Sequence, residues 1–365
     1  MHHKISFTGY YGMKNFGDDL FCWLSIKAAD KYWKGNTLVV VAPPLKDLSC
    51  NYSVPTSLGK LYRSHDIFGK ITRFIFNLKA RLFSDKIVYA GGSLFSAKPT
   101  GVRGILDRVP LAELSTIGVS VGPFKTKQDK EEVINHLNRF KYVSVRDIQS
   151  YKYLHNSLNI TNSSVDLAGL IPQVFDTKKE NKTDYLHIGF SPCNWNQSII
   201  TPEEYCNAFI DSMKLFNITS KKIKLTLLSL NNHEITGDDE LCLLIKNKLL
   251  NSQLDVEVVK YSDIGIKRTL DIINNFDAYI SARLHGGICA YMLNTPFYLF
   301  EYHKKCVDFK SVIKYRFSYE GVDHLNFYEI YNRLVSSKYT IGLQPEYYSH
   351  SAVSNFTCAP WASKC

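Results

Sequence analysis

The residue pattern in this chain best suited to binding an anion is an arginine and a histidine beside two glycines. The segment Ser281-Ala-Arg283-Leu-His285-Gly286-Gly287-Ile288 falls between a predicted strand and a predicted helix. In an extended turn, alternation places Arg283 and His285 on the same side. Gly286 and Gly287 would free the backbone so that helix N–H groups point at a ligand, without a competing carboxylate. Such a site suits a compact ligand that carries both carboxylate and phosphate.

The role of this segment has a plainer alternative. A histidine satisfied in the core, beside an arginine in an ion pair, would show the same residue types. Downstream, Lys304 and Lys305 follow His303 and would add positive charge to the site, although a solvated charged run is the plainer interpretation. Both polar side chains lie in an otherwise apolar junction of strand and helix, which favours a functional role.

A second candidate site begins with the glycine-rich segment from Gly9 to Asp19. A glycine-rich loop before a helix usually indicates phosphate binding. Here Asp18 and Asp19 occupy the positive end of the helix dipole and would repel an anion. Together with Asn15 they suit the hydroxyls of a neutral sugar, and an Asp can accept a proton from one. The alternative is that the Asp residues only cap the helix.

Two further strand ends carry residues that would complete these sites. Gly91, Gly92 and Ser93 directly follow a predicted strand, and glycines there allow close approach to a ligand. Arg146 ends another strand, and Asp166 lies further along the chain. An arginine in such a place is more often ion-paired than catalytic, but an anionic substrate would use it.

Short apolar strands alternate with helices along the chain. In the first half we expect strands at 5–8, 38–42, 86–90, 117–121 and 142–145, with one helix from about Asp18 and another over 129–140. In the second half we expect strands at 187–190, 224–229, 256–259, 278–281 and 297–300, and helices over 203–216, 239–250, 270–275 and 286–293. This pattern is typical of parallel sheets whose ligands bind at the carboxyl ends of the strands.

The polar segment 176–184 shows no periodicity and is predicted to connect two domains. We expect an N-terminal Rossmann-like domain over residues 1–175 that takes the sugar, and a C-terminal one over 185–335 that takes the anion. Residues 336–365 form a tail that would pack back on the first domain. The expected fold class is therefore α/β, with two facing Rossmann-like domains and a central cleft.

The composition narrows the function. Apolar residues make up 45% and charged residues 21%, which is typical of a globular protein. The net charge of +10 is spread along the chain without a zinc-finger or RNA-binding pattern, so we expect small anionic substrates and no nucleic acid. Nine Cys without a C-x-x-C pair indicate reduced thiols and no metal site. We see neither a signal peptide nor a membrane-spanning run, and therefore expect a cytoplasmic protein.

The order and spacing of these motifs resemble the polysaccharide pyruvyl transferase family from the first strand to about Phe309. The segments that carry the resemblance are Gly12–Asp19, Ala90–Phe95, Arg146–Ser150, Asp166–Ala168, Arg283–Gly286 and Lys304–Phe309. Ala90 departs from a family triple glycine, and Asp19 stands where Glu is commoner. The resemblance implies a glycosyltransferase-B-like fold, phosphoenolpyruvate (PEP) as donor substrate, and no metal or other cofactor.

The resemblance also implies that Arg146, Arg283 and His285 would hold PEP. From the residues themselves we expect Gly286, Lys304 and Lys305 to complete this PEP site. The acceptor is expected to be a galactose, mannose or N-acetylmannosamine residue of a cell-surface glycan, often lipid-linked. From the residue types at the two glycine-rich loops, we expect the acceptor to contact Asn15, Asp18, Asp19, Gly91, Gly92 and Ser93.

A mechanism follows from the chemistry of PEP, an enol ether that must gain a proton at C3 before C2 becomes electrophilic. His285 is our candidate general acid, although a phosphate donor without proton transfer is the alternative role. Asp18 or Asp19 would deprotonate the sugar hydroxyl that adds at C2. Arg283 and Arg146 would stabilise the departing phosphate as a second hydroxyl closes the cyclic ketal.

Two other functions fit the same pattern. A glycosyltransferase that uses a nucleotide-sugar would share the fold, because a fold alone does not assign a function. A non-catalytic sugar-binding homologue is less consistent with the joint presence of Arg283, His285, Arg146 and Asp18.

The segment from Arg63 to Phe83 predicts an amphipathic helix. Its apolar residues fall on one face: Ile67, Phe68, Ile71, Phe74, Ile75, Leu78 and Leu82. The other face carries Lys70, Arg73, Lys79 and Arg81. Such a helix suits an anionic membrane surface, which a lipid-linked acceptor would also require. The plainer alternative is that the apolar face packs on the sheet while the basic face is in water.

Overall fold

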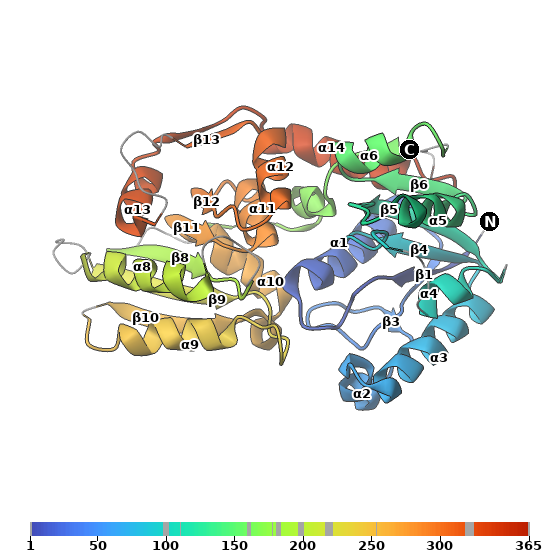
Figure 1. Cartoon of the computed structure of the whole chain (residues 1–365), viewed down its shortest axis with the longest axis horizontal. Helices are drawn as coiled ribbons and strands as arrows, with labels where there is room; N and C mark the ends of the chain where they lie inside the picture. Colours follow the sequence, from blue (N-terminus) through green and yellow to red (C-terminus); the bar gives the residue numbers. More distant parts are fainter. Residues whose placement is uncertain are drawn as a thin grey trace. The chain divides into compact units, whose positions relative to one another are not determined.

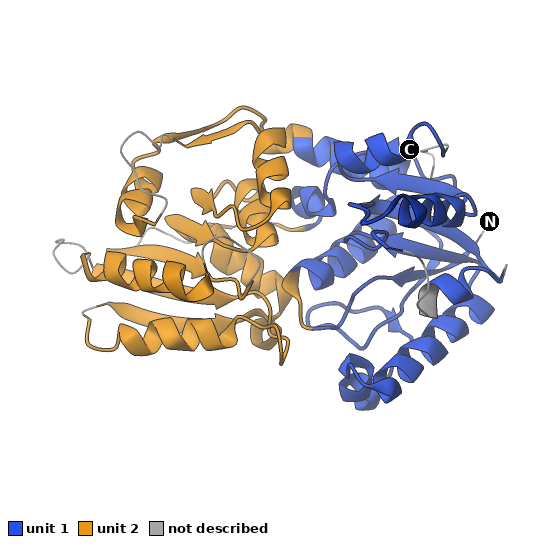
Figure 2. Ribbon diagram, in the orientation of Figure 1, with its two compact units in different colours: residues 1–13, 17–174, 348–365 blue, residues 14–16, 175–347 orange. Residues whose placement is uncertain are grey.

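A computed structural model of the chain describes residues 2–97, 102–109, 111–158, 162–176, 178–179, 184–195, 201–215, 222–252, 254–317 and 325–363. The chain divides into two compact units, shown in Figure 2. Unit 1 comprises residues 1–13, 17–174 and 348–365, and unit 2 comprises residues 14–16 and 175–347. Of the predicted connecting segment 176–184, residues 177 and 180–183 lie outside the described residues.

Unit 1 is built on a parallel sheet of seven strands in the order β3-β2-β1-β4-β5-β6-β7 (Figure 1). The strands are β1 (Lys4–Thr8), β2 (Thr37–Val40), β3 (Asn51–Tyr52), β4 (Lys86–Ala90), β5 (Glu113–Val119), β6 (Tyr142–Val145) and β7 (Asn162–Ser163). The helices are α1 (Phe16–Tyr32), α2 (Gly59–Arg63), α3 (Ile67–Phe83), α4 (Val102–Leu106), α5 (Lys127–Leu137), α6 (Ile148–Leu154), α7 (Ile171–Val174) and most of α14 (Pro345–Thr357), with short 3-10 turns η1 (Thr56–Leu58) and η2 (Leu167–Leu170).

Unit 2 contains a parallel sheet of five strands in the order β10-β9-β8-β11-β12. They are β8 (Tyr185–Ser191), β9 (Lys222–Ser229), β10 (Asp255–Lys260), β11 (Ala278–Ser281) and β12 (Phe297–Leu299), and β13 (Tyr315–Phe317) pairs separately with β14 (Tyr339–Ile341). The helices are α8 (Pro202–Leu215), α9 (Asp239–Lys248), α10 (Tyr261–Asn274), α11 (Leu284–Met292), α12 (Lys304–Val312) and α13 (Phe327–Val335).

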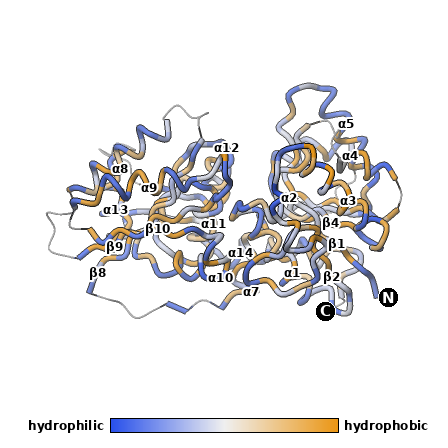
Figure 3. Tube along the Cα trace, turned by 90° about the horizontal axis from the view of Figure 1, so that it is seen from below, coloured by the Kyte–Doolittle hydropathy of each residue, from blue (hydrophilic) through white to orange (hydrophobic). Residues whose placement is uncertain are grey.

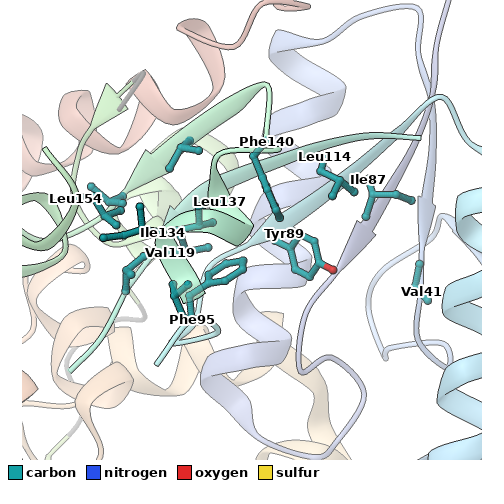
Figure 4. Close-up of a cluster of buried hydrophobic side chains, with 14 of the residues drawn as sticks. Val41, Ile87, Tyr89, Phe95, Leu114, Val119, Ile134, Leu137, Phe140 and Leu154 are labelled. Atoms are coloured by element: carbon teal, nitrogen blue, oxygen red, sulfur yellow. The ribbon is translucent and has the colours of Figure 1, made fainter. Parts of the chain in front are cut away.

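Buried apolar side chains hold each helix layer to its sheet. Figure 4 shows the cluster over β4, β5 and β6, where Phe95 stacks edge-on against Tyr89 and Phe140 at ring distances of 5.6 and 5.9 Å. One side of this cluster is polar: Tyr89 donates to Asp107, which also forms an ion pair with the buried Arg81. His136 Nε2 lies 3.1 Å from the same carboxylate. Because every charged group here has a partner, the burial is tolerated.

The C-terminal segment forms part of the core of unit 1. Trp33 packs on Phe356 with ring centroids 4.9 Å apart and donates its indole N–H to the Phe356 carbonyl at 2.9 Å. Asn355 binds Ser144 of β6 and Ser164 through its side-chain amide. The unit boundary therefore falls inside α14, between Tyr347 and Tyr348.

The structure corrects one expectation about helix α3. We expected either that its apolar face packs on the sheet or that this face is free for a membrane. In the structure Ile67, Phe68, Ile71, Ile75 and Leu82 are exposed, whereas Arg81 is buried. The plainer alternative, with the apolar face on the sheet and all four basic side chains in water, is therefore wrong.

Candidate functional site

The sheets of both units have the strand order of a Rossmann fold, and this order determines where a ligand can bind. In unit 1 the order reverses between β1 and β4, and in unit 2 between β8 and β11. Loops at the carboxyl ends of two such strands diverge and leave a crevice at this switch point. The loop after Thr8 and the Gly91–Ser93 loop follow the two central strands of unit 1, and the Arg283 segment follows β11 in unit 2.

Three hydrogen bonds fix the glycine-rich loop after β1. Tyr11 donates its hydroxyl to the carbonyl of Ala90 at 2.5 Å, which joins this loop to the end of β4 across the switch point. Gly12 has a φ of 73° and donates its N–H to Oδ1 of Asp19 at 2.6 Å, and Arg63 Nε binds the Gly12 carbonyl at 2.7 Å. Asp19 is only 5% exposed, so its observed contact is with the loop. Its binding to a sugar stays a prediction.

Asp18 lies beside the second glycine-rich loop. It is half-buried in the first turn of α1, and a Cβ on Gly92 would stand 3.5 Å from Asp18 Oδ1. Gly91 and Gly92 both have positive φ angles, of 67° and 79°. A side chain on Gly91 would collide with the ring of Phe21 at 2.5 Å, so glycine is required there by packing as well as by conformation.

Arg146 joins this group from the end of β6. Its Nε donates to Ser120 at 2.7 Å, Nη1 forms an ion pair with Asp166, and Nη2 lies 3.4 Å from the hydroxyl of Ser93. The guanidinium also stands over the Phe21 ring, 5.3 Å from its centre. All three nitrogens are thus engaged, and the residue that we expected to bind PEP belongs to unit 1, next to the predicted acceptor residues.

Asn15 is placed differently from the rest of the predicted acceptor set. Residues 14–16 belong to unit 2, where Asn15 forms an antiparallel bridge with Asn231 and Phe16 donates its N–H to the Leu230 carbonyl at 2.9 Å. The other predicted acceptor residues belong to unit 1. The structure therefore gives Asn15 contacts with the loop after β9.

In unit 2 the central feature is a buried ion pair of Arg283 and Asp238. Arg283 Nε donates to Asp238 Oδ2 at 2.8 Å, and Nη2 donates to Oδ1. Asp238 is completely buried and also accepts the N–H of Asn194 at 2.9 Å. Burial raises the pKa of Asp238 and the guanidinium opposes that shift. Within the described part of the chain, Nη1 of Arg283 makes no hydrogen bond, and the arginine side chain is 17% exposed. Its binding of a ligand stays a prediction.

The two glycines after His285 serve packing, because both lie inside helix α11 and neither has a positive φ angle. A Cβ on Gly286 would stand 2.3 Å from the Ser281 hydroxyl, and one on Gly287 would stand 3.0 Å from Leu299. Helix α11 therefore packs closely on β11 and β12. The expectation of an extended turn through His285 is wrong, because Arg283 is the last extended residue and His285 is half-buried in the first turn of the helix. As expected, that turn contains no acidic residue.

Aromatic side chains lie between Arg283 and the predicted lysines. Burial raises the pKa of Tyr302, and the nearby guanidinium of Arg283 and backbone of Leu284 oppose this shift. Trp195 contacts Tyr302 and His303, with ring centroids 6.3 and 5.9 Å away. His303 caps α12 by accepting the N–H of Lys305 at 3.1 Å.

The two predicted lysines lie in the first turn of α12. Lys304 is exposed and Lys305 is half-buried. Their binding of PEP stays a prediction.

Sequence reasoning missed Asp238, Tyr302 and Trp195. Asp238 directly precedes a predicted helix and could be interpreted only as a cap. Its pairing with Arg283, 45 positions away, follows from the meeting of two loops in space. Tyr302 and Trp195 carried no signal beyond the general abundance of aromatic residues.

Comparisons with known proteins agree with this architecture. A family model described as polysaccharide pyruvyl transferase matches residues 15–304. No curated protein matches the chain significantly in sequence.

Three similar solved structures carry UDP or UDP-GlcNAc in their descriptions. The S. aureus MnaA–UDP co-structure has a TM-score of 0.58 and 11% identity, covering 100% of this chain and 93% of that one. UDP-N-acetylglucosamine 2-epimerase from Rickettsia bellii has a TM-score of 0.58 and 13% identity, covering 97% of this chain and 93% of that one. UDP-GlcNAc 2-epimerase from Methanocaldococcus jannaschii has a TM-score of 0.57 and 11% identity, covering 97% of this chain and 98% of that one.

At such low identity these structures support the fold alone, and they confirm the expected class of two Rossmann-like α/β units of the glycosyltransferase-B type. The family match supports more than the fold, because it covers most of the chain. It also includes the motifs at the strand ends of both sheets. On this ground the chain belongs to the polysaccharide pyruvyl transferase family.

Proposed function

We propose that the protein transfers pyruvate from PEP to a sugar residue of a cell-surface polysaccharide or its lipid-linked precursor, forming a cyclic ketal. The observation that supports this most is Arg283 at the start of α11, at the switch point of unit 2. Its Nη1 and the acid-free first turn of α11 offer donors to an anion, while Asp238 holds the guanidinium in one orientation. A fixed donor set of this kind is suited to a carboxylate or phosphate.

The donor would bind in unit 2. Arg283, His285 and Gly286 form the core of this proposed site, and Lys304 and Lys305 of the neighbouring helix α12 would add positive charge. Tyr302 lies close to both helices, because it is near the backbone of Leu284 and directly precedes the cap of α12. Arg146 remains a proposed PEP ligand, but its present contacts all lie in unit 1.

The acceptor would bind in unit 1. Asp18 lies beside Gly92, and Ser93 lies within reach of Arg146. Hydroxyl and carboxylate groups together suit a neutral polyol, and Asp18 is the half-buried carboxylate of this group. We assign it the role of base toward the attacking sugar hydroxyl. Asp19, Gly91 and Asn15 would support or extend this site.

The reaction balances in two steps. In the first, the C2–C3 double bond of PEP takes a proton at C3, from His285 in our assignment, while a sugar hydroxyl bonds to C2 and loses its proton to Asp18. In the second, another hydroxyl of the same sugar bonds to C2, inorganic phosphate leaves with its electron pair, and the hydroxyl proton leaves with it. Arg283 would stabilise the charge on the departing phosphate. No cofactor is needed for this balance.

The decisive experiment is a comparison of donors with the intact chain. The protein is incubated with candidate glycans and either PEP or nucleotide-sugars, and mass spectrometry follows the acceptor while phosphate release is measured. We expect pyruvate on the acceptor and phosphate in equal amount with PEP only. Transfer of a sugar from a nucleotide-sugar would establish the competing glycosyltransferase function. Binding of glycan without either reaction would indicate a non-catalytic homologue.

The place of action follows from the proposed acceptor. No described helix is long and apolar enough to cross a membrane. We propose a cytoplasmic enzyme of cell-envelope or exopolysaccharide biosynthesis, which works at the inner face of the membrane when its acceptor is lipid-linked.

A further inference from the structure

Helix α3 exposes the apolar face that an amphipathic helix normally buries. Ile67, Phe68, Ile71, Ile75 and Leu82 are 64%, 63%, 48%, 53% and 55% exposed, and we call these five residues the apolar face of α3. Figure 1 shows α3 at the edge of unit 1, beyond the sheet, and the hydropathy colouring of Figure 3 shows hydrophobic stretches in it as in the strands. Exposed apolar surface of this extent normally marks an interaction site.

The opposite face holds the helix in place through Phe76, which packs partly buried against the core, and through smaller residues. Gly69, Thr72, Asn77 and Ala80 are the small or polar residues buried there. A Cβ on Gly69 would stand 2.0 Å from the Ser64 carbonyl, so the helix lies directly on the preceding turn. Asn77 accepts a hydrogen bond from Thr8 of β1 at 3.3 Å.

The four basic residues divide into two pairs with different roles. Arg73 donates to the carbonyls of Tyr62 and Ser64, and Arg81 is buried in its ion pair with Asp107. These two arginines are structural. Lys70 and Lys79 are exposed, and the helical period places them on either side of the apolar face.

The charge around this face selects a partner. Between Ile67 and Phe83 there is no Asp or Glu, and the exposed carboxylate of Asp66 caps the start of the helix. Along its length the exposed side of α3 therefore offers apolar residues bordered by the cations Lys70 and Lys79. Leu61 of α2 and Ile105 of α4 are exposed as well, and both of these helices contact α3. A convex helix with an apolar centre and lysines at its borders matches a bilayer surface with anionic head groups.

We infer that α3 is a docking surface for an anionic membrane, lying in the plane of the interface with its apolar face toward the acyl chains. Lys70 and Lys79 would reach the head groups from either side. This inference concerns unit 1 alone and does not depend on the use of PEP. A second copy of the chain is the competing occupant of the apolar face, and the test below separates the two.

The test measures co-sedimentation of the full chain with vesicles of phosphatidylglycerol and phosphatidylcholine in equal parts, at low and high salt. We expect binding at low salt that salt weakens, and little binding to phosphatidylcholine alone. Lys70→Gln with Lys79→Gln should weaken partitioning by about 30-fold, because each lysine near an anionic surface contributes roughly fivefold. Ile71→Ser with Ile75→Ser should weaken it by at least about tenfold through loss of buried apolar area.

Matched variants control for charge and hydrophobicity. Lys125→Gln with Lys127→Gln removes the same charge from exposed positions near α5, and Leu243→Ser with Leu244→Ser removes exposed apolar residues from α9. Both controls should bind vesicles as the unchanged chain does. Equal effects of control and α3 variants, or no binding at low salt, would overturn the inference. The inference would also be overturned if the chain did not bind vesicles and formed, in analytical ultracentrifugation, a dimer that only the Ile71/Ile75 variant abolishes.

Discussion

Asp238 holds Arg283 by two hydrogen bonds from a position with no exposure to solvent. The guanidinium is therefore both a structural partner and the proposed PEP ligand. Burial tends to lower the pKa of Arg283, but the charge and hydrogen bonds of Asp238, together with Cys193 and Tyr302, outweigh this and raise the pKa, so the arginine stays charged whether or not a ligand is present. Any substitution of Arg283 affects both the stability of unit 2 and the proposed PEP site. Variants must therefore be designed to separate these two effects.

Arg283→Ala should reduce both stability and activity. Removal of the guanidinium leaves the Asp238 carboxylate buried and unpaired, which costs about 3–5 kcal/mol of the free energy of unfolding. The rate of PEP-dependent transfer should fall by about two orders of magnitude or more. Chemical denaturation and a phosphate-release assay measure the two effects. Arg283→Lys should also fail, because an ammonium cannot replace the planar fork that Asp238 binds.

A double variant separates the two roles of Arg283. Arg283→Gln with Asp238→Asn removes both charges and retains hydrogen-bonding groups, so it should recover much of the stability that Arg283→Ala loses. Activity should remain low. Near wild-type turnover in this folded variant would remove Arg283 from the mechanism.

Asp18→Asn should damage acceptor use and spare PEP binding. The carboxylate lies at the start of α1 in unit 1, beside Gly92, and the proposed PEP site is built from α11 and α12 in unit 2. Loss of a general base typically costs about 10²–10⁴-fold in rate. Calorimetry with PEP and kinetics with the acceptor separate the two substrates. Loss of PEP affinity in Asp18→Asn, with affinity kept in Arg283→Gln/Asp238→Asn, would reverse this assignment.

Local patterns in the sequence were sufficient for much of the fold. Strands β4, β6 and β11 begin and end where their apolar runs do, at 86–90, 142–145 and 278–281. Helix α10 shows where pattern alone fails: only its second part, from Leu270, was expected. Gly265 interrupts it with a φ of 87°, and the residues before this kink do not continue the apolar period.

The site was predictable at the level of strand ends and not at the level of contacts. Glycines after strands correctly indicated loops at the switch points, because the chain must turn there. Which carboxylate pairs with which arginine depends on loops that meet only in the folded chain, as with Asp238 and Arg283. Periodicity likewise predicted the apolar face of α3 but not whether this face points to the sheet or to solvent. Small residues such as Gly69 and Ala80 allow a helix to pack as closely as large apolar residues do.

Acidification should weaken the cap of helix α12. Burial, assisted by Lys305, lowers the pKa of His303 below its ordinary 6.5, and its neutral Nδ1 accepts the Lys305 N–H. A histidine with a lower pKa in the folded protein binds fewer protons there than in the unfolded chain, so stability falls as the pH drops from about 6.5. The lost cap costs roughly 1 kcal/mol.

The comparison for this effect is His303→Asn, which retains a capping side chain without a titratable ring. Thermal unfolding measured between neutral and mildly acidic pH should show a smaller loss in this variant than in the unchanged chain. An identical pH profile for both proteins would mean that His303 does not contribute.

Gly286→Ala tests whether this glycine serves packing or ligand approach. A Cβ there would stand 2.3 Å from the Ser281 hydroxyl and 2.6 Å from that of Tyr279, both buried. Ser281 bonds the N–H and carbonyl of Arg283, at 3.1 and 2.7 Å, so its displacement would move the arginine as well. We expect a loss of about 1–3 kcal/mol in the free energy of unfolding, together with a raised KM for PEP. Gly287→Ala meets only the flexible Leu299 at 3.0 Å and should cost less in both measurements. A stable Gly286→Ala protein with a raised KM would instead assign this glycine to ligand approach alone.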